Sequence, residues 1–223
     1  MPLVSQWVQR MRCCVIAERA QCRAGLEETV EAALRAGVRA VQLREKEATT
    51  LELYELAGRL RQLTRQHDAL LLVNDRADVA LAVEADGVHL GWQSLPVAEV
   101  HRLVGRDLLV GKSVHNLEEA RQAVADGVDY VFAGPVYDTP SKAGLVATLG
   151  IERLRDICDA IDLPVIGLGG IDPSNAAAVL RAGACGVAVI RAILAAADST
   201  TAATQLLAAL SGGTGILPVI GSD

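Results

Sequence analysis

The sequence predicts an α/β fold, a single (β/α)8 TIM barrel, from two observations. One phrase recurs, in which a helical stretch and then Ala-Gly or Asp-Gly lead into a short Val-rich run. It stands as EAALRAGVRAVQLRE, ALAVEADGVHLG, RQAVADGVDYVFAGP and AAVLRAGACGVAVIR. Strict alternation of helical and strand patterns indicates a parallel sheet. About eight such units in 223 residues favour closure of that sheet into a barrel.

Each strand is expected where a short apolar run follows a turn signal. These runs are Cys13–Ala17, Ala40–Leu43, Leu70–Val73, Gly87–Leu90, Leu108–Val110, Asp129–Phe132, Pro164–Leu168 and Cys185–Val189. The helical patterns between them are Glu27–Ala36, Thr50–Gln66, Ala77–Glu84, Pro96–Val104, Leu117–Ala125, Ile151–Ala160, Pro173–Arg181 and Thr200–Leu210. Four glycines follow helical stretches, and we expect each to end a helix in the left-handed conformation, which glycine adopts without steric penalty. They are Gly37, Gly87, Gly127 and Gly183.

An open, doubly wound sheet is the alternative fold, but the GxGxxG run that usually follows its first strand is missing. We therefore expect one barrel domain over residues 13–210. We also expect residues 1–12 to form a short helical lead-in segment and residues 211–223 to form a Gly-rich flexible tail.

Composition and charge exclude several classes of protein. Hydrophobic residues make up 51% of the chain but aromatic residues only 3%, as in the aliphatic core of a buried parallel sheet. A net charge of −6 argues against nucleic-acid binding, which needs a basic patch. No apolar run is long enough to cross a membrane, and the segment MPLVSQWVQRMR lacks a signal-peptide core. We expect a cytoplasmic protein that binds neither nucleic acid nor membrane.

The cysteines agree with a reducing compartment. There are five, Cys13, Cys14, Cys22, Cys158 and Cys185, with no CxxC pair. We expect them to be buried as small apolar side chains rather than to form disulfides or a zinc site.

Basic side chains are predicted to gather at one end of the barrel, because the active site of this fold lies where the strands end. Arg44, Lys46, Lys112, Lys142 and Arg191 all follow predicted strands. Such a cationic rim suits phosphate or diphosphate. After the seventh strand, the Gly169-Gly170 pair leaves backbone N–H groups for a phosphate.

Each of these residues also has a plain structural interpretation. Glu45 and Lys46 could be solvated surface charges, and Asn74-Asp75 could cap a helix. Gly169-Gly170 could form a tight turn, and His115 could pack at the rim. Their joint placement at one rim favours a site over this set of separate explanations.

The ordered motifs QLREK, VNDRADVAL, ADGVHLG, KSVH, GPVY with a downstream Ser-Lys, and GLGGI followed by AGACGVAVI resemble the thiamine-phosphate synthase family. That family also contains thiazole tautomerases, and the resemblance runs from about residue 15 to residue 194. It implies an enzyme of thiamine biosynthesis, a transferase. Such an enzyme couples 4-amino-2-methyl-5-hydroxymethylpyrimidine diphosphate with a thiazole phosphate, yielding thiamine phosphate and diphosphate.

The resemblance also implies roles for particular residues. Gln42, Arg44, Lys46, Asn74 and Ser113 match contacts to the pyrimidine diphosphate, and Lys142 matches the lysine on its diphosphate. Thr139 and Ser141 match hydroxyls near the thiazole phosphate or the diphosphate, and Gly170 and Ile190 match the cradle of the thiazole phosphate. Asp75 matches a Mg²⁺ ligand, so Mg²⁺ is the implied cofactor. We take Lys142, Ser113 and His115 as the catalytic candidates.

Three positions depart from the family pattern. Ser94 stands where the family has the aspartate that is its second Mg²⁺ ligand, and we expect Ser94 to bind the metal more weakly than a carboxylate does. Arg191 stands where serine is common, and it could still meet phosphate. Ala17-Glu18 stands where the family has Thr-Asp.

Other functions stay open. Ser94 together with His115 also resembles the tautomerase branch, in which that histidine moves a proton on a thiazole carboxylate phosphate. A catalytically inactive barrel that binds phosphate ligands as a regulator is a third interpretation, and another phosphate-handling barrel enzyme, such as an aldolase, is a fourth. The sequence leaves open whether the chain forms a homodimer and whether its thiazole substrate carries a carboxylate.

Overall fold

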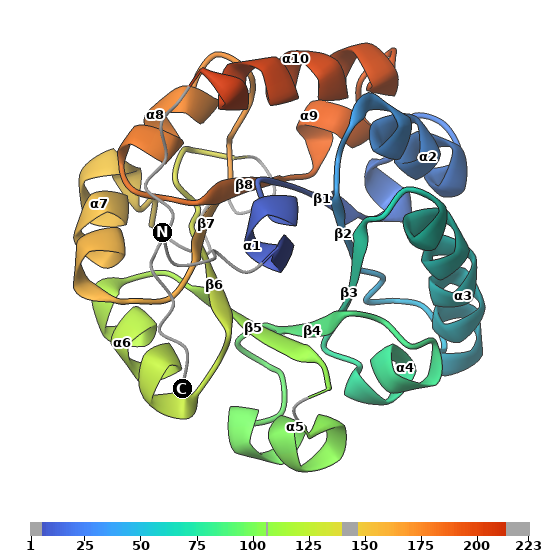
Figure 1. Ribbon diagram of the computed structural model, residues 1–223, viewed down its shortest axis with the longest axis horizontal. Coiled ribbons are helices and arrows are strands. Elements are labelled where there is room, and N and C mark those ends of the chain that lie inside the picture. Colours follow the sequence, from blue (N-terminus) through green and yellow to red (C-terminus); the bar gives the residue numbers. More distant parts are fainter. Residues whose placement is uncertain (1–5, 106, 140–146, 213–223) are drawn as a thin grey trace.

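Eight strands form a closed barrel. The computed structural model describes residues 6–105, 107–139 and 147–212. The strands pair in parallel in chain order, and the first also pairs with the last. In Figure 1, which looks down the barrel, helices surround this ring of strands. The predicted (β/α)8 barrel is confirmed, and the open doubly wound sheet is excluded.

The strands are short and nearly all buried. They are β1 (Cys13–Ala17), β2 (Ala40–Leu43), β3 (Leu70–Asn74), β4 (Gly87–Leu90), β5 (Leu109–Val114), β6 (Tyr130–Ala133), β7 (Val165–Leu168) and β8 (Gly186–Val189). β5 runs further than predicted because its polar residues still pair in register: Lys112 lies beside Leu90 and Ser113 beside Phe132.

The helices of six or more residues cover the outside of the barrel. They are α1 (Gln6–Arg10), η1 (Arg19–Gln21), α2 (Leu26–Ala36), α3 (Thr50–Gln66), α4 (Ala77–Ala82), α5 (Val97–Val104), α6 (Leu117–Asp126), α7 (Gly150–Ala160), α8 (Ala176–Arg181), α9 (Arg191–Leu194) and α10 (Ser199–Ser211). The short helices η1 and α9 were not predicted. A single turn of helix carries no apolar period by which to recognise it.

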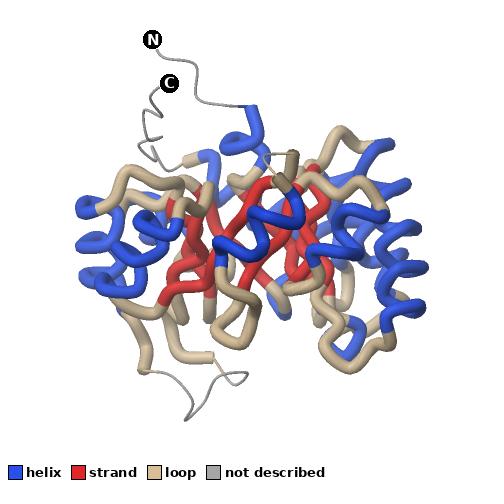
Figure 2. The backbone as a smooth tube through the Cα atoms, turned by 90° about the horizontal axis from the view of Figure 1, so that it is seen from below, coloured by secondary structure: helices blue, strands red, loops and turns tan. Residues whose placement is uncertain are grey.

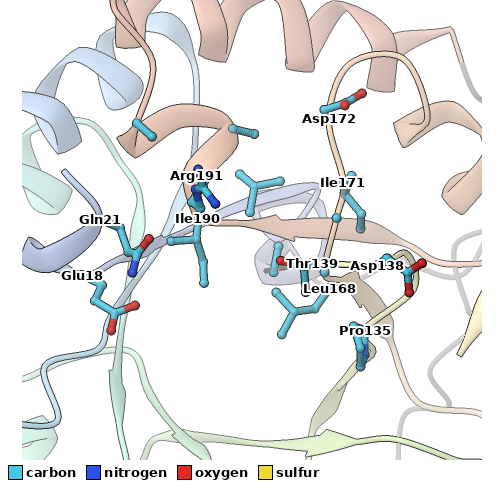
Figure 3. A pocket seen from close by; sticks show the side chains of 16 residues that line it. Glu18, Gln21, Pro135, Asp138, Thr139, Leu168, Ile171, Asp172, Ile190 and Arg191 are labelled. Carbon is cyan, nitrogen blue, oxygen red and sulfur yellow. The ribbon is translucent and has the colours of Figure 1, made fainter. Parts of the chain in front are cut away.

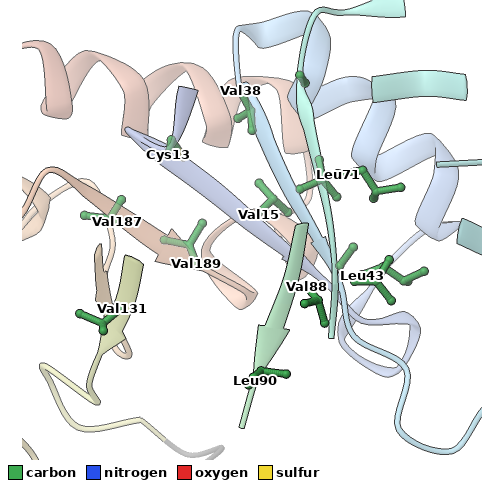
Figure 4. Packing of buried hydrophobic residues seen from close by; sticks show 14 of the residues in the cluster. Cys13, Val15, Val38, Leu43, Leu71, Val88, Leu90, Val131, Val187 and Val189 are labelled. Atoms are coloured by element: carbon green, nitrogen blue, oxygen red, sulfur yellow. The ribbon is translucent and has the colours of Figure 1, made fainter. Parts of the chain in front are cut away.

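Most of the core lies between the strands and the helices. Figure 4 shows side chains of this layer on several strands, among them Val15, Leu43 and Val88. Neighbouring residues of a strand point to opposite faces. Accordingly Cys13 belongs to the outer layer and Cys14 to the barrel interior. All five cysteines are free thiols, and three of them are buried.

Aromatic and aliphatic side chains fill the barrel interior, so it is no channel. Tyr130 and Phe132 are its largest members, and Met11 and Val8 pack against the same cluster. The ring centroid of Trp7 on α1 lies 6.2 Å from that of Tyr130. Figure 2 shows α1 at one end of the barrel and long loops at the other. The backbone N–H of Val187 in β8 donates to the carbonyl of residue 12. Residue 12 directly precedes β1 and follows α1, so α1 covers the end of the barrel where the strands begin.

One of the four glycine predictions was wrong. Gly87 does not end a helix in the left-handed conformation, since it already lies in β4. A Cβ there would stand 2.6 Å from the carbonyl oxygen of Leu109, so glycine is needed for the close approach of β5. The left-handed residue after α4 is Glu84, with φ of 52°. Gly37, Gly127 and Gly183 are left-handed as predicted.

Helix α8 begins three residues later than predicted. Asp172 accepts a hydrogen bond from the backbone N–H of Ser174 at 2.8 Å, and its own N–H donates to the Asn175 side chain at 3.0 Å. These bonds hold residues 172–175 in a turn, so the helix starts at Ala176. Within the described ranges, no helix is both long and apolar enough to cross a membrane.

Candidate functional site

A chain of hydrogen bonds crosses the carboxyl ends of β2 and β3. The Gln42 amide nitrogen donates to Asn74 Oδ1 at 2.9 Å, and the Asn74 amide nitrogen donates to Asp75 Oδ2 at 2.6 Å. Gln42 is 1% exposed, and its Oε1 is buried without a partner in the described part of the protein. A buried acceptor without a donor costs free energy, so this oxygen suits a ligand that brings an N–H group.

The chain continues to the loop after β4. The Ser94 hydroxyl donates to Asp75 Oδ1, and it accepts a hydrogen bond from the Gly91 N–H at 2.6 Å. The same Gly91 N–H also reaches Asp75 Oδ1 at 3.2 Å. Asp75 has φ of 61°, a left-handed conformation that is uncommon for a residue with a side chain and that often marks functional sites. Ser94 and Gly91 therefore hold this aspartate in place.

Asp75 is the one carboxylate of this cluster. Across the described residues, no group of three or more His, Cys, Asp or Glu side chains lies close enough together to bind a metal. Mg²⁺ is commonly held by one or two carboxylates together with substrate phosphates and water. The residues present thus fit Mg²⁺ only in company with a phosphorylated ligand.

Two ion pairs join the loops that follow β1 and β2. Arg44 lies 2.9 Å from Glu18 Oε1, and Arg19 Nε lies 3.2 Å from Glu45 Oε2. The Arg19 backbone N–H also donates to Glu45 Oε1. Lys46, the next residue, is exposed. Arg44 is therefore held at the rim, whereas Lys46 extends into solvent beside it.

Ser113 projects into the barrel from β5. Its hydroxyl oxygen lies 3.0 Å from His89 Nε2, and His89 Nδ1 lies 3.3 Å from the Tyr130 hydroxyl. We did not predict a role for His89, which is 2% exposed. The pattern of β4 does contain a signal: Val88 and Leu90 face the helices, so the position between them faces the interior.

His115 follows β5 and is held by α6. Its Nδ1 lies 2.9 Å from Glu119 Oε2, and its backbone N–H donates to the same oxygen at 2.8 Å. His115 lies at the carboxyl end of β5, and Glu119 fixes its side chain.

The prediction for Lys112 was wrong. Its ammonium lies 2.9 Å from Asp126 Oδ2, at the last residue of α6, so Lys112 points outward between the barrel and its helices. The hydrogen bond from Lys112 holds the pKa of Asp126 below its usual value. In a strand, successive side chains alternate between faces; the inward position belongs to Ser113, and Lys112 cannot share it.

A cavity of about 370 Å³ opens at the carboxyl ends of β1, β6, β7 and β8. Figure 3 shows its lining, with Glu18 and Gln21 at the left, Ile190 and Arg191 in the middle, and Thr139 to the right of them. Asp138 and Asp172 lie farther around the rim. Thr139, Gly170, Ile190 and Arg191, predicted as binding residues, all line this one cavity.

The floor of the cavity is built from the Gly169-Gly170 pair. Both are left-handed, with φ of 100° and 64°. A Cβ on Gly169 would stand 2.6 Å from the Pro135 Cβ, and one on Gly170 would stand 2.7 Å from the Tyr137 Cβ. Glycine is thus required at both positions, because the loop after β6 packs closely against this backbone.

Arg191 begins α9, directly after β8. The first N–H groups of a helix lack partners within it and favour anions, and Arg191 adds a full positive charge. Its side chain is exposed. Gln21 on η1 also lines the cavity, although it was not predicted to do so. The Ser141 and Lys142 assignments lie outside the described residues.

The site thus has two neighbouring parts at one end of the barrel: a polar chain from Gln42 to Ser94 and a glycine-floored cavity.

The comparisons with known proteins agree on a family. A family model described as thiamine monophosphate synthase matches residues 13–193. The chain is 50% identical over 182 residues to a thiamine-phosphate synthase of Chloroflexus aurantiacus, an alignment covering 82% of this chain and 84% of that protein.

Two further comparisons extend this likeness. The chain is 45% identical over 209 residues to a thiamine-phosphate synthase of Synechocystis sp., which covers 94% of this chain but 61% of that longer protein. The solved structure of a thiamine phosphate pyrophosphorylase from Pyrococcus furiosus superposes with a TM-score of 0.85 at 40% identity, over 92% of this chain and 98% of that one. The chain belongs to the thiamine monophosphate synthase family.

Proposed function

We propose that this chain couples 4-amino-2-methyl-5-hydroxymethylpyrimidine diphosphate with a thiazole phosphate, giving thiamine phosphate and diphosphate. The observation that supports this most is the pairing of two different subsites. A polar chain that ends on a carboxylate lies beside a separate cavity whose floor is the Gly169-Gly170 backbone. A reaction that joins two phosphorylated substrates needs such a pair of subsites.

The aminopyrimidine fits the end of the chain at Gln42. Its ring carries an amino group, and the buried Gln42 Oε1 is an acceptor that lacks a donor. We assign this amide to the pyrimidine, with Asn74 holding the amide in place. The site would select the aminopyrimidine because its amino group donates to this oxygen. An analogue without the amino group would leave the oxygen buried and without a hydrogen bond.

The diphosphate fits the neighbouring positive and hydroxyl groups. We assign Arg44, Lys46 and Ser113 to it, together with Lys142. Asp75 would hold Mg²⁺ with the diphosphate oxygens, with Ser94 beside it as the donor that orients Asp75. When bound, Mg²⁺ supplies neutralising charge to the leaving diphosphate.

The thiazole phosphate fits the glycine-floored cavity. We assign its phosphate to the backbone at Gly170 and Ile190, with the charge of Arg191 nearby and Thr139 lining the same cavity. From the family resemblance we assign Ser141 to the same ligand. The thiazole nitrogen would then face the pyrimidine subsite, since both subsites open at the same end of the barrel.

The chemistry asks more for charge stabilisation than for proton transfer. The bond between the pyrimidine methylene and the diphosphate oxygen breaks, and its electron pair leaves with the diphosphate. Arg44, Lys46 and Lys142 stabilise the charge that develops there. The aminopyrimidine ring carries the positive charge left behind, and the thiazole nitrogen attacks with its lone pair. Catalysis is then mainly positioning and electrostatics.

The tautomerase interpretation depends on His115. The Gln42–Asn74–Asp75 chain has no purpose in an isomerase with one thiazole substrate, which is why we favour coupling. His115→Ala distinguishes the two: it should abolish tautomerisation of a thiazole carboxylate phosphate, whereas coupling should retain most of its rate.

The free cysteines are those of a protein in a reducing compartment, and we place the enzyme in the cytoplasm on that ground.

The test is a coupling assay. Purified protein receives pyrimidine diphosphate, thiazole phosphate and Mg²⁺, and mass spectrometry follows thiamine phosphate. We expect product from the unaltered chain and a loss of about a hundredfold or more for Lys142→Ala, with the folded state unchanged by circular dichroism. Absence of product with intact pyrimidine diphosphate would reject coupling. A Lys142→Ala rate within a few-fold of the unaltered chain would reject that residue's role.

A further inference from the structure

His89 is a buried histidine that the coupling reaction described above does not use. It lies in β4, is 2% exposed, and points into the barrel. Its ring centroid lies 4.2 Å from that of Phe132 and 5.6 Å from that of Tyr130. Both of its ring nitrogens lie within hydrogen-bond distance of a hydroxyl, Ser113 on one side and Tyr130 on the other.

Tyr130 is fixed on the side of His89 that faces the closed end of the barrel. Its side chain is fully buried, and burial raises the pKa of its hydroxyl well above the usual value, so the group stays protonated. Gly111 makes room for the ring, since a Cβ there would stand 2.0 Å from Tyr130 Cζ. Trp7 packs against the same ring from α1. The phenol is therefore a protonated hydroxyl, held in place inside the barrel and able to donate to His89 Nδ1.

A neutral imidazole has one nitrogen that donates and one that accepts. If the Tyr130 hydroxyl donates to Nδ1, then Nε2 carries the proton and donates to Ser113 Oγ. That bond occupies a lone pair of the serine oxygen, and the serine proton must point elsewhere. The open end of the barrel, where the anionic ligand belongs, is the direction away from His89.

We propose that His89 is a positioning residue: held as the Nε2–H tautomer by Tyr130, it turns the Ser113 hydroxyl proton toward the open end of the barrel, ready to donate to an anionic oxygen of the substrate. The relay runs from Tyr130 through His89 to Ser113. It rests on the proposed function in one respect, that Ser113 contacts the pyrimidine diphosphate.

The first test reads the tautomer directly in the protein without substrates. Nitrogen-15 NMR of histidine-labelled protein distinguishes protonated from unprotonated ring nitrogens, and the spectrum of His89→Gln identifies the His89 signals among the four histidines. We expect a protonated Nε2 and an unprotonated Nδ1. Tyr130→Phe keeps the packing and removes only the hydroxyl, so it should shift His89 toward a mixture of tautomers. A protonated Nδ1 in the unaltered protein would overturn the proposal.

The second test asks whether His89 acts through Ser113. We expect His89→Met, which lacks a donor, to lower kcat for coupling about tenfold, and His89→Gln, whose amide N–H can replace Nε2–H, to recover most of that loss. In the Ser113→Ala background, His89→Met should change kcat by less than about twofold, because the group it positions is gone. Multiplying effects in the double variant would overturn the proposal.

The two tests separate this proposal from the coupling reaction itself. If the unaltered protein makes no thiamine phosphate, the function fails while the tautomer still reports on the relay. If product forms but the tautomer is Nδ1–H, or the two substitutions act independently, the relay fails and the function stands.

Discussion

The Arg44 guanidinium donates a hydrogen bond to Glu18 Oε1 at 2.9 Å, and this ion pair joins the two parts of the site. Glu18 lines the glycine-floored cavity, whereas Arg44 belongs to the rim beside the Gln42–Asn74–Asp75 chain. Their side chains are 23% and 29% exposed. The carboxylate both orients Arg44 and offsets part of its charge.

Glu18→Gln should therefore tighten the binding of diphosphate. Glutamine keeps an acceptor for Arg44 but removes the negative charge, so the affinity for inorganic diphosphate should rise about two- to fivefold. Arg44→Ala should weaken it about tenfold. Isothermal titration measures both. Glu45→Gln is the matched control, because Glu45 pairs with Arg19 instead. An unchanged affinity in Glu18→Gln would show that the Glu18 charge does not act on the ligand.

Ser94→Asp should make the metal bind more tightly and the metal-free protein less stable. Ser94 now donates a hydrogen bond to Asp75, so a second carboxylate there would replace an attraction with repulsion until a cation enters. We expect Mg²⁺ to raise the melting temperature of the variant more than that of the unaltered protein, and half-maximal coupling to need less Mg²⁺.

Ser94→Asn serves as the control, since it is close in shape to aspartate but neutral. A direct signal comes from Trp92, which is 79% exposed in the same loop, once Trp7 is replaced by Phe. Its fluorescence should report Mg²⁺ binding without any turnover. If the asparagine and aspartate variants respond alike to Mg²⁺, residue 94 does not face the metal.

Gly170→Ala should weaken the binding of the thiazole phosphate specifically. The backbone is left-handed at φ of 64°, and a Cβ would stand 2.7 Å from that of Tyr137, so the cavity floor must shift. We expect KM for the thiazole phosphate to rise about tenfold or more while KM for the pyrimidine diphosphate changes little. Steady-state kinetics with each substrate varied in turn gives both values. Equal increases would mean that the two substrates do not occupy separate subsites.

Asp126→Asn should lower stability near neutral pH but not in acid. The hydrogen bond from Lys112 keeps the pKa of folded Asp126 below its usual 3.8, so the carboxylate stabilises the fold above that pH. This contribution is lost as the pH falls through the folded value. We expect the melting temperature of the variant to be about 1–3 °C lower at neutral pH, with the gap closing in acid. A gap that persists in acid would point to lost packing.

Lys112→Met tests the same pair from the other side. It should reduce stability at neutral pH by a similar amount and leave the affinity for diphosphate unchanged, because Lys112 points away from the rim. Weakened diphosphate binding would restore Lys112 to the site.

The barrel was predictable because its signals are local. Helix α3, for example, carries an apolar period and a start signal, a capping box at Thr49 and Glu52. The four-residue strands are recognisable because parallel strands buried on both faces are apolar throughout. The rim positions of Gln42, Asn74 and Asp75 follow from the strand ends alone.

What the sequence could not provide was the direction in which single side chains point. Lys112 and Ser113 are adjacent, yet one pairs with a helix and the other enters the barrel, and only the register of β5 decides which. The Glu18–Arg44 pair joins residues 26 positions apart in the chain, so no local sequence pattern predicts it. His89 was hidden for a similar reason, since its partners come from two other strands.

Among the residues that the structure describes, the packed interior and helix α1 close one end of the barrel and leave the other end open. Both substrates must enter, and both products must depart, through the same end of the molecule. Released diphosphate and the next pyrimidine diphosphate therefore compete for the same subsite at this end. Diphosphate should inhibit competitively against that substrate. The rate of turnover therefore depends on exchange of substrates and products at the open end. The end covered by α1 contributes to the stability of the fold instead.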